Sequence, residues 1–202
     1  RLFSTPNMPV TTQDHFIGLH ASTLVRDGGT LQIGIGAMGD ALAAALLARQ
    51  GDAPEYQALL ADLDLAPWQV LIEREGGTAP FAQGLYGCSE MFVNGLLALA
   101  EAGVVRRPVA DGVLVHGGFF LGPQAFYQRL REMPLAQRKS FAMHAISFIN
   151  ELYGDEALKR EQRRDARFIN TVFTMTLMGA GVADQLEDGR VLSGVGGQYN
   201  FV

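Results

Sequence analysis

Short apolar runs alternate with longer helix-forming stretches along this chain, and this alternation limits the fold more than any other feature. The clearest unit is the run Thr30–Ile33, followed by the spaced glycines of Gly34–Gly39 and by an alanine- and leucine-rich stretch over residues 40–50. Gly51 then stops the helix. Because strands and helices alternate in this way, the sequence predicts an α/β fold, in which helices flank a sheet.

The remaining elements follow from the same reading. Helices are predicted over residues 12–24, 40–50, 55–65, 96–102, 123–132 and 155–165, and strands over residues 30–33, 68–73, 112–116 and 168–178. Residues 141–149 fit either type of element. A glycine loop is expected at 117–118 and a hairpin-like turn at 185–190. A run of basic residues is expected to form a solvated helix face: Lys159, Arg160, Arg163, Arg164 and Arg167.

The size and charge of the chain exclude several classes of protein. Its 202 residues can form one well-buried domain or two unequal lobes, and its net charge of −5 offers no general attraction to nucleic acid or to anionic membranes. The apolar stretch at 94–105 is too short to span a bilayer. The lone Cys88 cannot form an internal disulfide, which fits a reducing compartment and favours a cytoplasmic location.

The segment Gly34–Gly39 has the pattern G-x-G-x-x-G between a predicted strand and a predicted helix. Such a turn binds dinucleotides when the next strand ends in an acid roughly 20 residues further on. Here the first candidate strand end, Glu73, lies 34 residues past Gly39 (73 − 39), which disfavours a dinucleotide. A plain strand-to-helix turn and a site for an anion or oxyanion both stay open.

A second group of glycines lies near the end of the sequence. The run Ser193–Gln198 follows an apolar stretch, and its glycines leave backbone N–H groups bare for a ligand. Far upstream, Glu90 stands among apolar and small residues. A poorly solvated carboxylate and bare amides are what acyl transfer requires, as nucleophile and as oxyanion donors. The competing interpretation makes Glu90 a structural acid, paired with a base or with a helix end.

Other reactive side chains give weaker signals. Cys88 lies close to Glu90, but no base stands near it in the sequence, so it is expected to be a small buried hydrophobe. The four histidines lack H-x-x-x-H spacing and no C-x-x-C motif occurs, so no metal site is expected. Among the histidines, His116 is the one predicted to lie in a loop and to line a pocket.

Four segments, in their order along the chain, resemble the acetyl-CoA hydrolase/transferase family of CoA-transferases. The resemblance runs from about residue 12 to residue 202 and corresponds to the C-terminal catalytic half of the family's proteins. It implies that residues 1–202 are a piece of a longer two-half protein, truncated at both ends, with a connecting arm over residues 1–11. The segments are Leu31–Gly36, Glu90–Gly95, Phe168–Asn170 and Ser193–Gln198.

The resemblance also implies a catalytic site. Family members use a glutamate nucleophile, and Glu90 in S-E-M-F-x-x-G occupies its position. The carboxylate would attack an acyl-CoA and pass through an anhydride to a glutamyl-CoA thioester, which a second carboxylic acid or water resolves. The implied oxyanion donors are the amides of Ile35 and of Gly196 or Gly197. The implied contacts to coenzyme A come from Gly34, Gly36, Asn170, Gly194 and Gln198.

The function implied by the resemblance is a CoA-transferase acting on a short acyl-CoA and a carboxylic acid. Hydrolysis of acyl-CoA by the same glutamate and non-catalytic binding of coenzyme A are the alternatives. Coenzyme A would be a substrate, no tightly bound cofactor is expected, and the full-length protein is expected to be a homodimer.

The sequence departs from the family pattern in three places. Asn94 stands where many members have Asp, and residues 198–201 differ from the usual G-G-Q-x-D-F ending. The 55 residues from Ile35 to Glu90 (90 − 35) form a longer gap than in compact members, so residues 52–81 are expected to be an insertion. These departures indicate a divergent subfamily.

Overall fold

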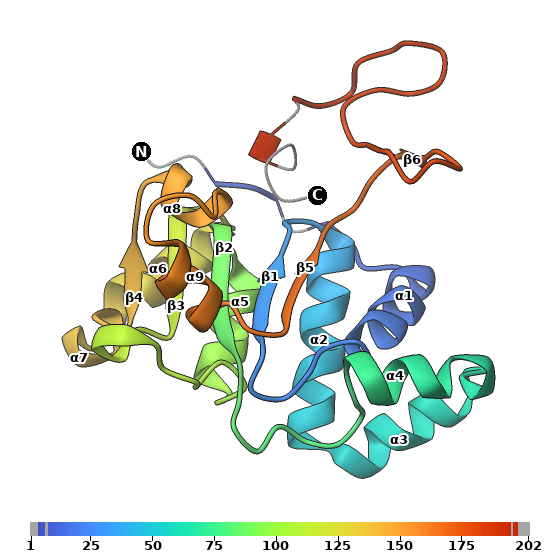
Figure 1. Ribbon diagram of the computed structural model, residues 1–202, viewed down its shortest axis with the longest axis horizontal. Coiled ribbons are helices and arrows are strands. Elements are labelled where there is room, and N and C mark those ends of the chain that lie inside the picture. Colours follow the sequence, from blue (N-terminus) through green and yellow to red (C-terminus); the bar gives the residue numbers. More distant parts are fainter. Residues whose placement is uncertain (1–3, 7, 195, 198–202) are drawn as a thin grey trace.

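Parallel strands form one sheet in the order β4-β3-β2-β1-β5 (Figure 1). The structure is a computed structural model and describes residues 4–6, 8–194, 196 and 197. The predicted α/β class, with helices flanking a sheet, is confirmed. The strands are β1 Thr30–Ile33, β2 Tyr86–Phe92, β3 Val115–Phe120, β4 Phe141–Met143 and β5 Ala166–Ile169.

The direction in which the sheet is built reverses at β1. Leu31 of β1 pairs with Gly87 of β2 on one side and with Arg167 of β5 on the other, both in parallel register. The chain therefore first adds strands toward β4 and then returns to the opposite side of β1. In open α/β sheets, ligands bind outside the carboxyl ends of the strands at such a switch point. The ends of β1, β2 and β5 are thus where a site is expected.

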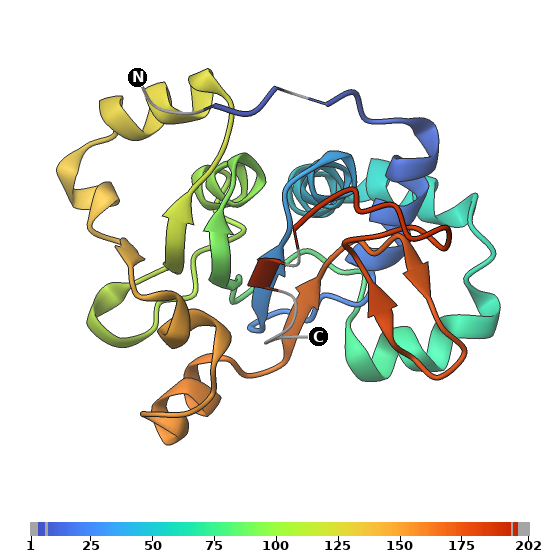
Figure 2. The same ribbon diagram turned by 90° about the horizontal axis from the view of Figure 1, so that it is seen from above.

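Helices cover both faces of the sheet (Figure 2). On one face, α2 (Ala37–Gly51) and α5 (Asn94–Glu101) bury leucines such as Leu42 and Leu96 in the main core. On the other face, Ile149 of α8 (Ile146–Asn150) packs on Tyr86 and Cys88. Further helices are α1 Thr12–Ser22, α6 Gln124–Glu132, α7 Leu135–Arg138 and α9 Glu156–Gln162. No helix among the described residues is long and apolar enough to cross a membrane.

Most predicted elements are present, but three differ from the prediction. Residues 68–73, predicted as a strand, lie in the short helices η1 (Ala66–Trp68) and α4 (Gln69–Glu75), because an apolar run of three residues fits either type of element. The predicted loop at 117–118 lies inside β3. Residues 168–178, predicted as one strand, divide between β5 and the two-residue strand β6 (Thr174–Met175), which pairs with β7 (Gly181–Val182).

The segment over residues 52–81 folds onto the helical side of the molecule. Its first helix, α3 (Ala53–Ala61), buries Tyr56 and Leu60 against Leu19 of α1. The hydroxyl of Tyr56 lies 2.7 Å from that of Ser22, so the segment is tied to the domain by apolar and polar contacts. That it is an insertion stays a prediction.

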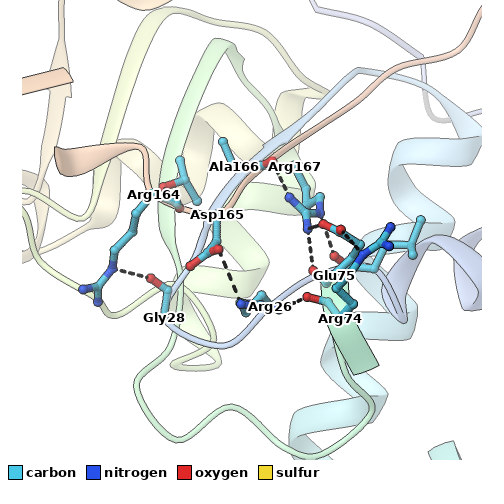
Figure 3. Close-up of polar contacts among 10 residues, drawn as sticks. Arg26, Gly28, Arg74, Glu75, Arg164, Asp165, Ala166 and Arg167 are labelled. Carbon is cyan, nitrogen blue, oxygen red and sulfur yellow. Dashed lines mark hydrogen bonds and ion pairs between the residues drawn. The ribbon is translucent and has the colours of Figure 1, made fainter. Parts of the chain in front are cut away.

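The basic run at residues 159–167 does not form a solvated helix face, contrary to the prediction. Lys159 is only 3% exposed, and Arg164 and Arg167 reach across to the loop before β1 and to α4 (Figure 3). Arg164 Nε donates to Gly28 O at 3.0 Å, and Arg167 Nη2 lies 2.9 Å from Glu75 Oε2. The prediction assumed that all five residues lie on one helix. The helix α9 ends at Gln162, and the basic run continues into β5.

His116 is buried in β3 and does not line a loop pocket as predicted. It is 6% exposed, and its Nδ1 lies 2.6 Å from the hydroxyl of Tyr86. Burial, with smaller contributions from the nearby His144 and Arg163, lowers the pKa of His116 to about 4. The fold therefore holds this imidazole neutral at physiological pH.

We expect His116 to make the protein less stable in acid. An unfolded histidine takes up a proton near pH 6.5, whereas the folded group does so near pH 4, so the unfolding free energy falls as pH drops between these values. The loss is at most about 3–4 kcal/mol. Urea unfolding of wild type and His116→Gln at pH 7 and pH 4.5 measures it. The variant should lose less stability over this range, and equal losses would contradict the prediction.

Candidate active site

A cavity of about 290 Å³ lies at the carboxyl ends of β1, β2 and β5, where the sheet reverses its direction. Its walls come from the turn after β1, from the end of β2, from the chain after β5 and from the glycine run near residue 195. The sheet thus brings together segments that are up to about 160 residues apart. The predicted site residues that line it are Gly34, Ile35, Glu90, Asn170, Gly194, Gly196 and Gly197.

Glu90 reaches this cavity from β2. Side chains alternate across a strand, so Glu90 points to the same face as Tyr86 and Cys88, the face that α8 covers. Its side chain is half-buried, and Oε2 accepts a hydrogen bond of 2.6 Å from Asn150 Nδ2. No ion pair of Glu90 is found among the described residues. The structural interpretation of Glu90 as a salt-bridged acid is therefore not supported.

Gly197 lies directly against the Glu90 carboxylate. A methyl group built on its Cα would lie 1.4 Å from Glu90 Oε2 and 2.7 Å from Asn150 Nδ2. No side chain fits there unless the carboxylate moves. The neighbouring Gly196 has φ +63°, a conformation that favours glycine. A glycine is therefore favoured at position 197 by the close approach of Glu90, and at position 196 by the positive φ angle.

The first glycine turn faces the same cavity from β1. Among the described residues, the amides of Ile35, Gly196 and Gly197 have no hydrogen-bond acceptor. Gly39 serves packing, because a methyl group there would lie 2.1 Å from Gly34 O. The turn therefore allows close strand–helix packing at Gly39 and places Ile35 at the wall of the cavity.

Gly36 does not line the Glu90 cavity. It forms the N-cap of α2 with φ +116° and lines a neighbouring cavity of about 270 Å³ on the other side of Ile35. Asp40 and Asn94 also line this second cavity, and burial raises the pKa of Asp40. The two cavities share Ile35 as a common wall.

Asn170 lines the Glu90 cavity, and its amide is already paired. Its Oδ1 accepts from Gln32 Nε2 and its Nδ2 donates to Gln32 Oε1, both at 3.1 Å. This reciprocal pair joins β1 to the end of β5. Gln32, which is 5% exposed, is a site residue that the sequence analysis missed. A polar residue inside a strand predicted to be buried was the available signal.

Asn150 is the second missed residue. It ends α8, is 6% exposed, and its Oδ1 is buried without a partner among the described residues. Lys159 of α9 fixes the chain after it by donating to Glu151 O at 3.0 Å and Tyr153 O at 2.8 Å. Asn150 lies 60 residues from Glu90 in the sequence, in a stretch that fits helix or strand, so no sequence pattern marks it.

Three further predictions concern Cys88, Gln198 and the absence of a metal site. Cys88 is buried, and burial raises the pKa of its thiol, in agreement with the prediction of an inert small hydrophobe. Gln198 lies outside the described residues. Within the described part of the chain, no three His, Cys, Asp or Glu side chains are grouped so that they could hold a metal ion.

Comparisons with known proteins bear on the family and the fold. Residues 122–202 match the model of the acetyl-CoA hydrolase/transferase C-terminal domain. A search of curated proteins with the sequence found no match.

Among solved structures, RipA from Yersinia pestis is 19% identical with a TM-score of 0.61, over 91% of this chain and 33% of RipA. A RipA mutant gives 20% identity and a TM-score of 0.66, over 99% of this chain and 36% of that one. A 4-hydroxybutyrate CoA-transferase from Porphyromonas gingivalis gives 19% identity and a TM-score of 0.46, over 72% of this chain and 28% of that one.

The RipA structures share the fold of this chain, which spans about a third of their length. Residues 122–202 are similar to the C-terminal domain of the acetyl-CoA hydrolase/transferase family, which is the family that the order of the motifs predicts.

Proposed function

We propose that this chain carries the catalytic glutamate of a CoA-transferase, which moves coenzyme A between a short acyl-CoA and a carboxylic acid. One observation carries the proposal: the half-buried Glu90 carboxylate lies against Gly197, in a cavity that both glycine turns line. The match of residues 122–202 to the C-terminal domain of the acetyl-CoA hydrolase/transferase family supports the reaction class.

In the proposed reaction, a Glu90 oxygen attacks the thioester carbonyl and the C–S bond breaks. This step gives an acyl-glutamyl anhydride and free CoA thiolate. The thiolate then attacks the glutamyl carbonyl, releases the acyl group as a carboxylate and leaves a glutamyl-CoA thioester. A second carboxylate attacks this thioester, and the same two steps run in reverse to give the new acyl-CoA and Glu90.

Each attack creates a negative oxygen that needs donors. The amides of Ile35 and of Gly196 or Gly197 are the proposed donors, since they belong to the walls of the cavity and have no acceptor among the described residues. Losing one such donor typically costs about 10²–10³ in rate. Binding of the remote parts of coenzyme A would hold the thioester in position for attack. Coenzyme A is a substrate in this proposal.

Asn150 is proposed to position the nucleophile. Its Nδ2 donates to Glu90 Oε2, which fixes the orientation of the carboxylate. We expect Asn150→Ala to lower kcat about 10–100-fold, with a smaller effect on KM, because a misplaced nucleophile loses rate rather than binding. Asn150→Asp should lower it further and move the pH profile upward, since two adjacent carboxylates resist ionisation. Unchanged kcat in both variants would contradict this role.

Hydrolysis of the glutamyl-CoA thioester by water is the alternative outcome at the same glutamate. It differs only in whether water reaches the thioester, which depends on closure of the cavity. A CoA-binding module without activity would keep the glycine turns but would not need Glu90 in this position. Release of CoA from several short acyl-CoAs, measured with and without acetate, separates transfer from hydrolysis.

Trapping of the covalent intermediate tests the proposal. The protein is incubated with acyl-CoA and then treated with hydroxylamine or borohydride, and the labelled peptide is located by mass spectrometry. A hydroxamate or a reduced side chain at Glu90 supports the mechanism. Label found only at other residues, or no label while CoA is being released, would overturn it.

The proposal extends to the assembly in which the chain acts. The chain spans about a third of the RipA structures, and we propose that full activity needs the other parts of such a fold. A cytoplasmic homodimer is the proposed state. Sedimentation of the active form, run at several concentrations, tests the dimer.

A further inference from the structure

A second and larger cavity, of about 890 Å³, lies away from the Glu90 site. It is lined by α3, α4 and the loop at 76–83, and the two helices lie together on the lower right of Figure 1. Asp27 and Gln83 line it just before β1 and β2 begin, so it belongs to the opposite end of the sheet from Glu90. None of the described residues lines both cavities.

Arg49 brings a buried positive charge to this cavity. It is 2% exposed, its Nε donates to Ala79 O, and its Nη1 donates to Ser22 O and Val25 O, at 2.7–3.1 Å. The guanidinium also lies 4.1 Å above the Phe81 ring. Within the described residues, Nη2 has no hydrogen-bond acceptor and Arg49 has no ion pair. Burying a charge is costly unless it is paired, so the Nη2 edge of this guanidinium, which has no acceptor there, is open to an anionic ligand.

The described acids that line the cavity form no ion pair with Arg49. Burial lowers the pKa of Arg49, and the Asp27 carboxylate is near enough to raise it by a smaller amount. The Asp27 carboxylate accepts backbone N–H groups of Ala82, Gln83 and Gly84 at 2.9–3.0 Å. Glu73 Oε1 accepts from Gln69 Nε2 at 2.7 Å. Both carboxylates already have donors.

The loop beside Arg49 offers further donors. A methyl group built on Gly77 would lie 3.7 Å from Arg49 Nη2, and Gly77 has φ +140°, a conformation that favours glycine. The Gly77 amide itself donates to Thr23 O at 2.9 Å. The next residue, Thr78, also lines the cavity, and neither its amide nor its hydroxyl has a partner among the described residues. Arg49 and Thr78 therefore line the same cavity, and Gly77, the residue before Thr78, lies close to the free edge of the guanidinium.

We propose that this cavity binds a small molecule through an oxyanion, either a carboxylate or a phosphate group, held by Arg49 Nη2 and by the amide and hydroxyl of Thr78. Charge-assisted hydrogen bonds of this kind are the strong ones, and the cavity volume is that of sites for small organic ligands. The site is independent of the proposed reaction at Glu90.

Nuclear magnetic resonance on the 202-residue chain tests the proposal. Inorganic phosphate and malonate are titrated separately to about 20 mM, at constant ionic strength set with chloride, a range that detects millimolar affinity. Saturable shifts of the Gly77 and Thr78 amides and of Arg49 Nε support the site. A response to phosphate alone identifies a phosphate ester as the ligand class, and a response to malonate alone identifies a carboxylate.

Three variants locate the binding. Thr78→Val and Arg49→Lys should each weaken the affinity at least about fivefold, and Thr78→Val keeps the proposal testable if the Arg49 variant does not fold. Arg74→Gln removes a charge from an exposed arginine that does not line the cavity, and it should bind as wild type does. Absence of saturable shifts, or an equal response in wild type and Thr78→Val, would overturn the proposal.

Discussion

Replacing Glu90 by Gln should lower the turnover of acyl-CoA by at least about 10³-fold, because an amide cannot form the anhydride or the glutamyl-CoA thioester. The shape and the hydrogen-bonding capacity of the side chain are nearly retained, so binding of coenzyme A should stay within a few-fold of wild type. Steady-state kinetics and calorimetric titration with coenzyme A, on the same preparations, measure both.

The matched control for this variant is Glu132→Gln. Glu132 is an exposed acid at the end of α6 and does not line the Glu90 cavity. The substitution therefore removes one negative charge, as Glu90→Gln does, but away from the site. It should retain wild-type turnover. If Glu90→Gln also kept its turnover, Glu90 would not be the nucleophile, and a CoA-binding module or another catalytic group would have to be considered.

Adding one methyl group at Gly197 should be nearly as damaging as removing the nucleophile. The new Cβ would lie 1.4 Å from Glu90 Oε2, so the carboxylate or the glycine turn must move by more than an ångström. Displacements of this size cost about 10²-fold in rate. We expect Gly197→Ala to lower kcat about 10²–10³-fold. Overpacking also costs about 1–3 kcal/mol of stability.

Gly51→Ala provides the control for an added methyl group. Gly51 is the last residue of α2, and a Cβ there meets no atom within 4 Å. This variant should retain activity and gain up to about 1 kcal/mol of stability, because alanine favours a helix more than glycine does. Thermal unfolding, followed alongside kinetics, separates the two effects. If Gly197→Ala were as active as Gly51→Ala, the close approach of Gly197 to Glu90 would not matter for turnover.

The fold class was predictable because it depends on local patterns. The strand at Thr30–Ile33 and the helix that follows it need only the apolar run, the glycine turn and the alanine-rich stretch. The same local reading was wrong at residues 68–73, where three apolar residues in a row do not distinguish a strand from a helix. It was also wrong at Lys159, because burial of a charged side chain depends on carbonyl groups supplied by the chain around Glu151 and Tyr153.

The sequence by itself determined the chemistry on offer: a carboxylate among apolar residues and two glycine turns that expose backbone amides. Only the tertiary structure decided that these groups share one cavity, since their meeting depends on β1, β2 and β5 lying side by side at the point where the sheet reverses. The hydrogen bond from Asn150 and the pairing of Gln32 with Asn170 were likewise decided there. The physical reason is that strand order and helix packing are set by burial over the whole chain, and no local pattern encodes them.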